Sequence, residues 1–271
     1  MEGARSQPRL RFRPQGPERG DRLLPDEVAV ALSFNGSTQA VMMATPDDLV
    51  DFATGFALTE GIARPSEIDS IEVVSAGRGL DVQVWLKPQA QVRLATRRRT
   101  MTGPIGCGLC GIDSIEQALR DLDPVVRSGF HMTPQQVHQA VDALAGVQRL
   151  RGRSGAVHCA AFWTAGAVVA AREDVGRHNA LDKLAGALVR ASGSGIEAQG
   201  AVVLTSRVSI DLVQKVAALG AGVLIALSTP TASAVDLAEQ LGITLICNTR
   251  QDGFDLYSHS DRLTTEALDV R

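Results

Sequence analysis

The chain has 271 residues, which at about 150 residues per domain is enough for two domains. Apolar residues supply 45% and charged residues 21% of the sequence, a balance that excludes a disordered chain, a collagen-like repeat and a coiled coil. The formal net charge of -3 argues against a protein that coats nucleic acid, because such proteins need a basic surface, and no nucleic-acid partner is expected.

Residues 1–24 are rich in Arg, Pro and Gly, and no apolar run follows their charges. This composition does not match a secretory signal and predicts a mobile, disordered tail. The four cysteines are too few for a disulfide scaffold, so we expect reduced thiols and a cytoplasmic protein. Residues 154–171 carry no charge, but glycines and a histidine interrupt them, which favours two short strands over a membrane span.

Residues 25–125 are predicted to form a small α+β domain that ends in a Cys-x-x-Cys loop. Asn35-Gly36 is a strong hairpin signal because both residues tolerate the backbone angles of a tight turn. Thr45-Pro46 followed by two acids is typical of a helix start. The expected elements are strands at 28–34 and up to 43, a helix up to Gly61, strands at 68–75 and 80–86, and a flexible loop at 97–111.

Residues 126–271 are predicted to form a larger α/β domain, after a boundary near residues 123–132. Aromatic residues are only 4%, so its sheet must be covered by Val, Leu, Ile and Ala on both faces. Short apolar strands alternate with helices, which implies parallel strands joined by right-handed crossovers. A short helix expected at 113–122 follows the Cys-x-x-Cys loop and precedes this domain. The expected elements of the domain are a helix at 133–145, a hairpin from 156, a helix at 180–190, strands at 201–205, 223–228 and 244–248, and helices from 209 and 231.

Ligands of such sheets bind beyond the carboxyl ends of the parallel strands. The loops at 206–209, 228–231 and 248–258 are therefore the expected ligand loops. Their candidate side chains are Ser206, Arg207, Ser228 and Thr229. The Gly-x-Gly-x-x-Gly spacing occurs in GCGLCG, at 106–111, which lies in the expected loop and does not follow a predicted strand, and the sequence contains no P-loop. Neither nucleotide fingerprint therefore assigns the ligand.

Cys107 and Cys110 stand two residues apart in the string GCGLCG, whose glycines leave the sulfurs little cover. Arginines at 97–99 and a predicted helix start near Asp113 favour the thiolate form. A reactive thiol, half of a zinc site, a redox dithiol and an inert loop all remain open at this stage.

His158-Cys159-Ala160 invites comparison with zinc-dependent deaminases, which need a glutamate two residues after the histidine. Ala160 stands at that position, and the Cys-x-x-Cys lies upstream rather than downstream. Deamination and a structural metal are therefore disfavoured. His158 is either a hydrogen-bonded structural histidine or a ligand contact.

The string at 172–179 places Arg172, Asp174, Arg177 and His178 directly before a predicted helix. A helix N-terminus beside Arg and His suits a phosphate or pyrophosphate. The alternative is a solvated turn with local ion pairs. Asp182 and Lys183 fall inside the helix and are expected at the surface.

Seven ordered strings together resemble the FdhD family of sulfurtransferases, which are needed for active formate dehydrogenase. The strings are VAVALSFNG with AVMMATPDDLVDFATGFALTEGI, GCGLCG, SGAVHCAAF, AREDVGRHNALDKLAGAL, TSRVSIDLVQKVAALG, STPTASAVDLAEQLGITLICNTR and GFDLYS. The resemblance runs from about Pro25 to Ser258. It implies a small α+β domain and a larger three-layer domain with a cytidine deaminase-like fold that lacks the zinc chemistry.

The resemblance also implies a reaction and its site. Sulfur from a cysteine desulfurase would be carried as a persulfide on Cys107, with Cys110 as the second loop cysteine. The acceptor would be the molybdenum bis-guanine dinucleotide cofactor of formate dehydrogenase, with GDP or GMP as partial mimics. Its binding segment would be Gly253, Phe254, Asp255, Leu256, Tyr257 and Ser258, together with His158, Arg172, Asp174, Arg177, His178 and the strand-end residues.

The same resemblance implies a homodimer that meets the desulfurase and the catalytic subunit of formate dehydrogenase. Two other functions stay open. The chain could be a cofactor chaperone that transfers no sulfur, or a dithiol oxidoreductase that uses both loop cysteines.

Overall fold

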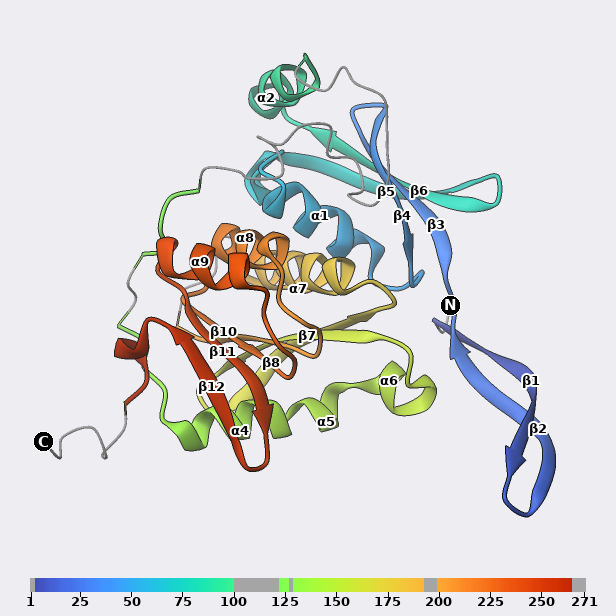
Figure 1. Ribbon diagram of the computed structural model, residues 1–271. Coiled ribbons are helices and arrows are strands. Elements are labelled where there is room, and N and C mark those ends of the chain that lie inside the picture. The colour runs from blue at the N-terminus through green and yellow to red at the C-terminus, as the bar shows by residue number, and fades with distance from the viewer. Residues whose placement is uncertain (1–2, 100–121, 127–128, 193–198, 265–271) are drawn as a thin grey trace, which may run out of the picture.

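The computed structural model describes residues 3–99, 122–126, 129–192 and 199–264. Within these ranges the strands form a two-stranded, a four-stranded and a six-stranded sheet. Helix α1 (Leu49–Thr59) lies between the four-stranded sheet and the helices on one face of the six-stranded sheet (Figure 1). The molecule is therefore a stack of layers in which α1 is shared by two domains.

The small domain agrees with the predicted strand order. Its elements are β3 (Val28–Phe34), β4 (Ser37–Ala44), α1, the 3-10 turn Pro65–Glu67, β5 (Ile68–Ala76), β6 (Gly79–Leu86) and α2 (Pro88–Arg99). The sheet order is β4-β3-β6-β5. Val30, Leu32 and Phe34 alternate along β3 and are fully buried. Asn35 and Gly36 both have positive φ, 48° and 75°, as the tight hairpin turn requires.

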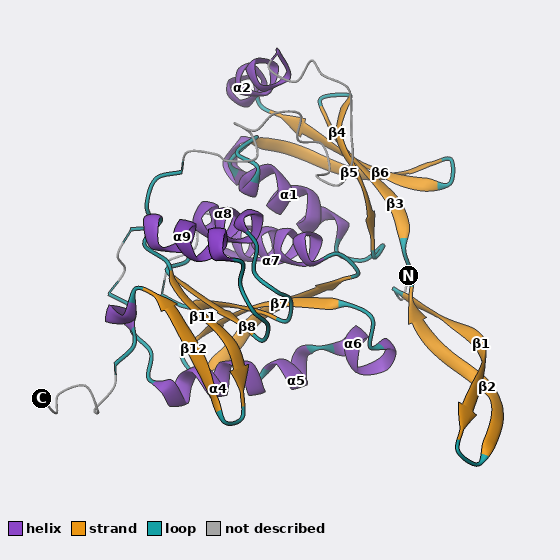
Figure 2. Cartoon of the chain, viewed as in Figure 1, coloured by secondary structure: helices purple, strands orange, loops and turns teal. Residues whose placement is uncertain are grey.

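The large domain has three layers. Its elements are α4 (Pro134–Asp142), α5 (Leu144–Val147), α6 (Arg149–Ser154), β7 (His158–Thr164), β8 (Ala167–Asp174), α7 (Arg177–Ser192), β9 (Ala201–Leu204), α8 (Ile210–Leu219), β10 (Val223–Ala226), α9 (Ala232–Gln240), β11 (Thr244–Arg250), β12 (Gly253–Ser258) and the 3-10 turn Ser260–Arg262. The sheet order is β12-β11-β10-β9-β7-β8. Helices α7, α8 and α9 cover one face, and α4 and α5 lie on the other (Figure 2). The mixed α/β fold is confirmed.

Three segments differ from the sequence expectation. Residues 4–25 form a hairpin of β1 (Ala4–Arg13) and β2 (Gly16–Pro25) instead of a mobile tail, because a two-residue alternation of Arg and apolar residues suits a strand. Helix α2 extends to Arg99 and so includes the first residues of the loop expected at 97–111, whose other residues lie outside the described ranges. The segment 253–258 is a strand, β12, and not a loop. The helix expected at 113–122 lies almost wholly outside the described residues.

Helix α4 starts as its sequence predicts. Thr133 accepts a hydrogen bond from the Gln136 backbone N–H at 3.2 Å, and the Gln136 side chain accepts one from the Thr133 N–H at 2.8 Å. Across the described ranges, no helix is long and apolar enough to span a membrane.

Candidate functional site

The carboxyl edge of the six-stranded sheet brings the predicted ligand loops together. Strands β9, β10 and β11 are parallel, so the loops that follow them start at the same edge. Strand β7 is antiparallel to β9, which places its first residue, His158, at this edge as well. The Cys159 N–H donates to Thr205 Oγ1 at 2.9 Å, and this contact fixes His158 beside the loop after β9. We call this edge the strand-end crevice.

Backbone hydrogen bonds tie the loops of the strand-end crevice to one another. Val208 N donates to Thr229 O at 3.3 Å, and Thr231 N donates to Val208 O at 2.9 Å. The next loop is joined in the same way, because Asn248 N donates to Ser228 O at 3.3 Å. The rim of the crevice is therefore one connected backbone surface, on which the hydroxyl groups of the loops are held in place.

One corner of the crevice is lined by basic side chains from three elements. Arg177 and His178 begin α7, Arg207 follows β9, and His158 begins β7. His178 Nε2 lies 3.5 Å from Asp211 Oδ2, which links the first turns of α7 and α8. We call the four residues His158, Arg177, His178 and Arg207 the basic corner.

The electrostatics of the basic corner favour an anion. Burial, and then the charge of Arg177, lowers the pKa of His158 below its usual 6.5. Burial, and then the charge of Arg207, lowers the pKa of Arg177 from its ordinary value. The Arg177 and Arg207 guanidinium groups therefore repel each other, and contact with His178 lowers the pKa of the neighbouring carboxylate, Asp211. A bound anion would relieve the repulsion.

Two buried polar atoms near the corner also lack partners. Arg177 Nε and Ser209 Oγ make no hydrogen bond to any described residue. Unsatisfied buried polar atoms are rare in folded proteins, and at the mouth of two helix N-termini they are well placed for an anionic ligand.

Strand β12 supplies the outer wall of the crevice through alternate residues. Asn248 Nδ2 donates to Asp255 Oδ2 at 2.6 Å and to the Tyr257 hydroxyl at 3.2 Å. Asp255 and Tyr257 therefore adjoin the loop end, as expected for crevice residues. Phe254 and Leu256 instead pack toward the core cluster on the α4 side of the sheet, and Ser258 is buried. A strand alternates its faces, so the six predicted residues cannot act as one ligand loop.

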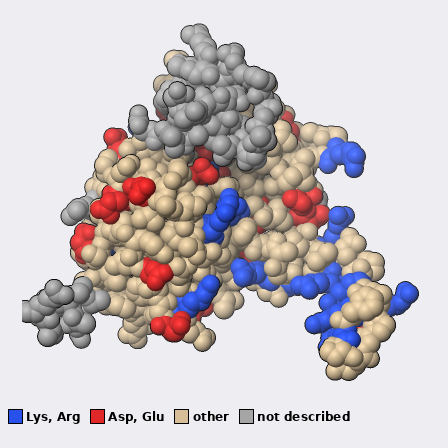
Figure 3. Space-filling model, viewed as in Figure 1, with Lys and Arg blue, Asp and Glu red and all other residues tan. Residues whose placement is uncertain are grey.

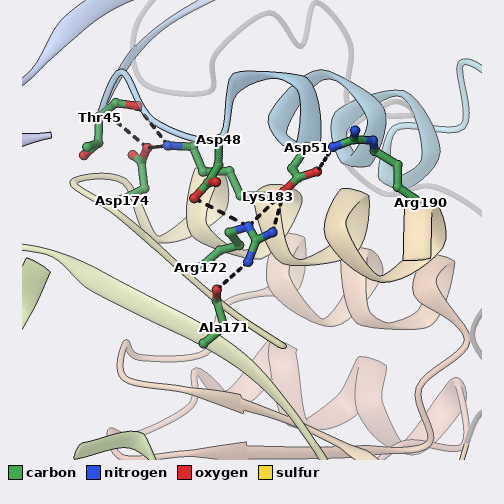
Figure 4. Close-up of polar contacts among 8 residues, drawn as sticks. All are labelled: Thr45, Asp48, Asp51, Ala171, Arg172, Asp174, Lys183 and Arg190. Carbon is green, nitrogen blue, oxygen red and sulfur yellow. Dashed lines mark hydrogen bonds and ion pairs between the residues drawn. The ribbon is translucent and has the colours of Figure 1, made fainter. Parts of the chain in front are cut away.

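Asp174 lies at the same edge but its carboxylate is fully occupied. It accepts hydrogen bonds from Thr45 N at 3.0 Å, Gly176 N at 2.8 Å and Asn179 Nδ2 at 2.9 Å. Lys183 Nζ lies 2.7 Å from it and also donates to the Thr45 carbonyl (Figure 4). Because Thr45 belongs to the small domain, this cluster joins the two domains. Lys183, expected at the surface, is fully buried.

Arg172 also faces the small domain and not the crevice. Its Nη2 and Nε lie 2.7 and 2.9 Å from Asp51 Oδ2, and Asp51 pairs in addition with Arg190 of α7 (Figure 4). Asp48 Oδ2 is 3.5 Å from the same guanidinium. The structure therefore uses Arg172 and Asp174 as contacts between domains, whereas Arg177, His178, Ser206 and Arg207 remain at the crevice.

A third ionic cluster across the junction was not predicted. Lys215 Nζ lies 2.7 Å from Glu60 Oε1 and 2.9 Å from Asp182 Oδ1, and Thr59 Oγ1 donates to Asp182 at 2.6 Å. Burial alone would lower the pKa of Lys215, but the charges of Asp182 and Glu60 outweigh it and raise that pKa. Asp182 is buried here, not at the surface as its sequence position had suggested.

The two domains touch through glycines at the crossing of α1 and α7. A Cβ atom added to Gly55 would lie 1.7 Å from the Asp182 carbonyl, and one added to Gly186 would lie 1.9 Å from the Asp51 carbonyl. The two backbones are therefore in direct contact. The sequence signal for this contact is a glycine in the middle of each helical pattern, which usually has a packing reason. We call this contact and the three ionic clusters the domain junction.

Cys107 and Cys110 lie outside the described residues. The other two cysteines are buried and free. Burial is the main cause that raises the pKa of both Cys159 and Cys247 to about 12. Neither thiol can serve as a nucleophile at neutral pH. The described part of the chain holds no group of three or more His, Cys, Asp or Glu side chains suited to a metal ion.

Fold and site define a class: a mixed α/β protein built on a four-stranded and a six-stranded sheet, with basic side chains at the carboxyl edge of the larger sheet. The sequence matches the FdhD/NarQ family over residues 25–264, and the chain belongs to that family. It is 51% identical over 260 residues to the sulfur carrier protein FdhD of Agrobacterium fabrum, covering 94% of each chain. It is 50% identical over 256 residues to that of Cupriavidus necator, covering 92% of this chain and 88% of the relative.

The fold also has a solved counterpart. A crystal structure of a putative formate dehydrogenase accessory protein from Desulfotalea psychrophila matches with a TM-score of 0.74 at 21% identity. The match covers 96% of this chain and 99% of the other. The family resemblance seen in the sequence strings is thus confirmed, and so is the fold class that it implied.

Proposed function

We infer that this protein is a sulfur carrier that serves formate dehydrogenase. The observation that carries the inference is family membership across residues 25–264, with relatives near 50% identity that are named sulfur carrier proteins. The sulfur would ride on Cys107 as a persulfide, received from a cysteine desulfurase. The acceptor would be the molybdenum bis-guanine dinucleotide cofactor, bound as substrate before it enters formate dehydrogenase.

The loading step is a thiol exchange in which all atoms are conserved. The Cys107 thiolate attacks the outer sulfur of the donor's persulfide, the donor S–S bond breaks, and the donor leaves as a thiolate. Cys107 then carries the outer sulfur. In delivery the Cys107 S–S bond breaks, its electron pair stays on Cys107 as the thiolate, and a zero-valent sulfur atom passes to the bound cofactor, which as acceptor supplies the two electrons that reduce this atom to sulfide. Only one cysteine is needed as carrier, so Cys110 would have an assisting role.

The strand-end crevice supports the cofactor-binding half of the proposal. Its basic corner offers Arg177 and Arg207 to a pyrophosphate, beside the N-termini of α7 and α8. Ser206, Ser228 and Thr229 add hydroxyl groups on the rim, and His158 lies on a neighbouring strand. A guanine dinucleotide has both the anionic pyrophosphate and the polar base that such a site can hold. The residues of this chain would bind and orient the cofactor, and the loop cysteine would supply the sulfur.

The decisive experiment compares Cys107→Ser and Cys110→Ser with the wild type. Each protein is incubated with a cysteine desulfurase and free cysteine, and persulfide is measured by mass spectrometry. The proposal expects no loading of Cys107→Ser and partial activity of Cys110→Ser, with nucleotide binding intact in both. Full loading of Cys107→Ser would contradict it.

The same data separate the two other functions. A dithiol oxidoreductase needs both partners of a disulfide, so both substitutions would be equally damaging and a Cys107–Cys110 bond would form on oxidation. A cofactor chaperone that transfers no sulfur predicts that neither substitution matters for activation of formate dehydrogenase.

A further inference from the structure

The β1–β2 hairpin projects from the body of the molecule as a separate ribbon (Figure 1). Its strands pair over their whole length, from Ala4 opposite Pro25 to Arg13 opposite Gly16. At its base, Arg22 Nη2 donates to the Ser154 carbonyl at the end of α6 at 3.2 Å. The hairpin precedes the region that matches the family. An isolated two-stranded hairpin has little stability of its own, so a contact made elsewhere is expected to support it.

The two faces of the ribbon have opposite chemistry. Directly opposed residues of an antiparallel pair point to the same face, and successive residues alternate. The paired register therefore assigns every side chain to a face. One face, the arginine face, carries Arg5, Arg9, Arg11, Arg13 and Arg22 with Gln7, Glu18 and Leu24. The other, the apolar face, carries Pro8, Leu10, Phe12, Pro17 and Leu23 with Ala4, Ser6, Arg19, Asp21 and Pro25.

The apolar face is open to solvent. Leu10 is 50% exposed and Phe12 is 77% exposed. Large apolar side chains grouped on one exposed face mark a contact surface more often than isolated ones do. Phe12 lies near the tip of the ribbon, where the structure gives it no cover. The exposed apolar side chains near the tip of the ribbon are therefore available to pack against another molecule.

The arginine face is one end of a longer basic band. Residues 4–25 hold six arginines and two acids, in a chain whose net charge is -3. Helix α6, which contacts the base of the hairpin, adds the exposed Arg149, Arg151 and Arg153. Lys and Arg side chains gather on the hairpin and continue across the body beside it (Figure 3). The Arg151 N–H donates to the Glu173 carboxylate at 2.8 Å, and Glu173 pairs with Cys159, the neighbour of His158, so the band reaches the basic corner.

The opposed faces select the kind of partner. The backbone of a nucleic-acid duplex is anionic on the side it presents, so it would engage the arginine face and leave Phe12 and Leu10 in water. A protein groove can engage both faces at once, with acidic residues on one wall and apolar residues on the other. The net negative charge of the whole chain also opposes a polyphosphate surface.

We propose that the β1–β2 hairpin is a docking arm for the catalytic subunit of formate dehydrogenase, inserted into a groove with one acidic wall and one apolar wall. The choice of partner rests on the proposed function. The basic band joins the arm to the crevice assigned to the cofactor, and the protein that receives the cofactor must dock beside that crevice. The sulfur donor, in contrast, has to reach the cysteine loop.

The test measures binding of the full-length protein to the cofactor-free catalytic subunit of formate dehydrogenase from the same organism. Wild-type binding should weaken as salt is raised from about 50 to about 300 mM, because salt screens the arginine contacts. Arg9→Gln/Arg11→Gln should weaken it by about tenfold through loss of steering and charge pairing. Leu10→Ser/Phe12→Ser should weaken it by about tenfold and change the salt dependence little.

Matched controls make the result specific. Arg64→Gln/Arg78→Gln removes the same charge from exposed sites on the small domain and should bind as the wild type does. Arg9→Lys/Arg11→Lys should keep most of the affinity, and circular dichroism should show every variant folded. Absence of binding by the wild type, or equal binding by all variants, overturns the proposal. So does an arginine-dependent affinity for duplex DNA, for anionic vesicles or for the desulfurase that exceeds the affinity for the catalytic subunit.

The docking proposal and the sulfur-carrier proposal can fail separately. Persulfide loading of Cys107 and binding of GDP do not involve the arm, so the hairpin variants should retain both. Loss of loading in the wild type, with arm-dependent docking intact, would reject sulfur carriage alone. Normal loading without arm-dependent docking would reject the docking arm alone.

Discussion

The domain junction and the basic corner each take some of their charges from residues 172–183, yet they use them in opposite ways. At the junction, the Asp174 carboxylate has Lys183 and three hydrogen-bond donors, and both ions are excluded from water. At the corner, the charge of Arg207 contributes to the lowered pKa of Arg177, and the charge of Asp211 opposes this effect. The ion pairs buried at the junction hold the domains together, whereas the charges at the corner have fewer partners and remain available to a ligand.

The first prediction concerns the buried ion pair of Lys183 and Asp174 and has the largest expected effect. Lys183→Met leaves Asp174 as a buried carboxylate without its counter-ion, so the free energy of unfolding should fall by about 3–5 kcal/mol. Urea denaturation measures the loss. Lys87→Met, at an exposed position, is the control and should change stability by less than about 0.5 kcal/mol. An equal loss of unfolding free energy in both variants would show that the buried ion pair does not stabilise the protein more than an exposed lysine does.

The second prediction addresses the glycine contact of the same junction. Gly186→Ala places a methyl group against the Asp51 carbonyl, so α1 and α7 must separate. The expected cost is about 1–3 kcal/mol, as for other overpacked interiors, although alanine is the better helix former. Thermal unfolding checks it, with Gly146→Ala as a control because an added Cβ there meets nothing within 4 Å. A stabilised Gly186→Ala would mean that the helices do not cross as closely as described.

The third prediction contrasts Arg207, which lies at the crevice, with Arg172, which lies at the domain junction. Arg207→Gln should weaken GDP binding by about tenfold, or about 1.4 kcal/mol, and leave stability nearly unchanged. Arg172→Gln should do the reverse, because its guanidinium pairs with Asp51 across the junction. Calorimetric titration measures the GDP affinity of each variant, and denaturation measures its free energy of unfolding. Should Arg172→Gln reduce affinity at unchanged stability, Arg172 would belong with the ligand after all.

The fourth prediction has the smallest effect and concerns pH. Burial keeps His158 neutral at pH 7, because its folded-state pKa lies below 6.5. A bound pyrophosphate favours the charged ring, so GDP affinity should rise a few-fold as pH falls from 6.5 toward that lowered pKa. Titrations in two buffers of different ionisation enthalpy report the proton uptake. The His158→Gln variant corrects for titration of the phosphate itself and should take up correspondingly fewer protons.

Local signals in the sequence predicted local structure well. Asn35-Gly36 predicted the hairpin turn, and Thr133 with Gln136 predicted the start of α4, because each feature depends on neighbouring residues. The pattern of parallel strands likewise placed Ser206 and Ser228 at one edge. The destination of Asp174 could not be predicted in this way, since Thr45, which donates to it, is 129 residues away. Which charges close on a distant domain depends on tertiary packing, and a single sequence does not show that.

The glycines of the junction illustrate a signal that was present and not used. Gly55 and Gly186 each interrupt a helical run of apolar residues, and each marks the point where two backbones meet. The hairpin is a contrasting case, because its composition predicts a tail whereas its alternation of Arg with Leu10 and Phe12 predicts a strand. Periodicity was the better guide there, since composition does not separate a charged coil from a two-faced ribbon.

The burial of Cys159 and Cys247 has a consequence for chemical selectivity. A persulfide exchanges with any thiolate that it meets, so additional reactive thiols would scramble the cargo among several positions. With a pKa of about 12, each of these two thiols is ionised to only about one part in 10⁵ at neutral pH. A thiol-specific dye should therefore spare both residues in the native protein and label them only after unfolding. Burial of Cys159 and Cys247 would thereby prevent two of the chain's four cysteines from exchanging sulfur with a persulfide.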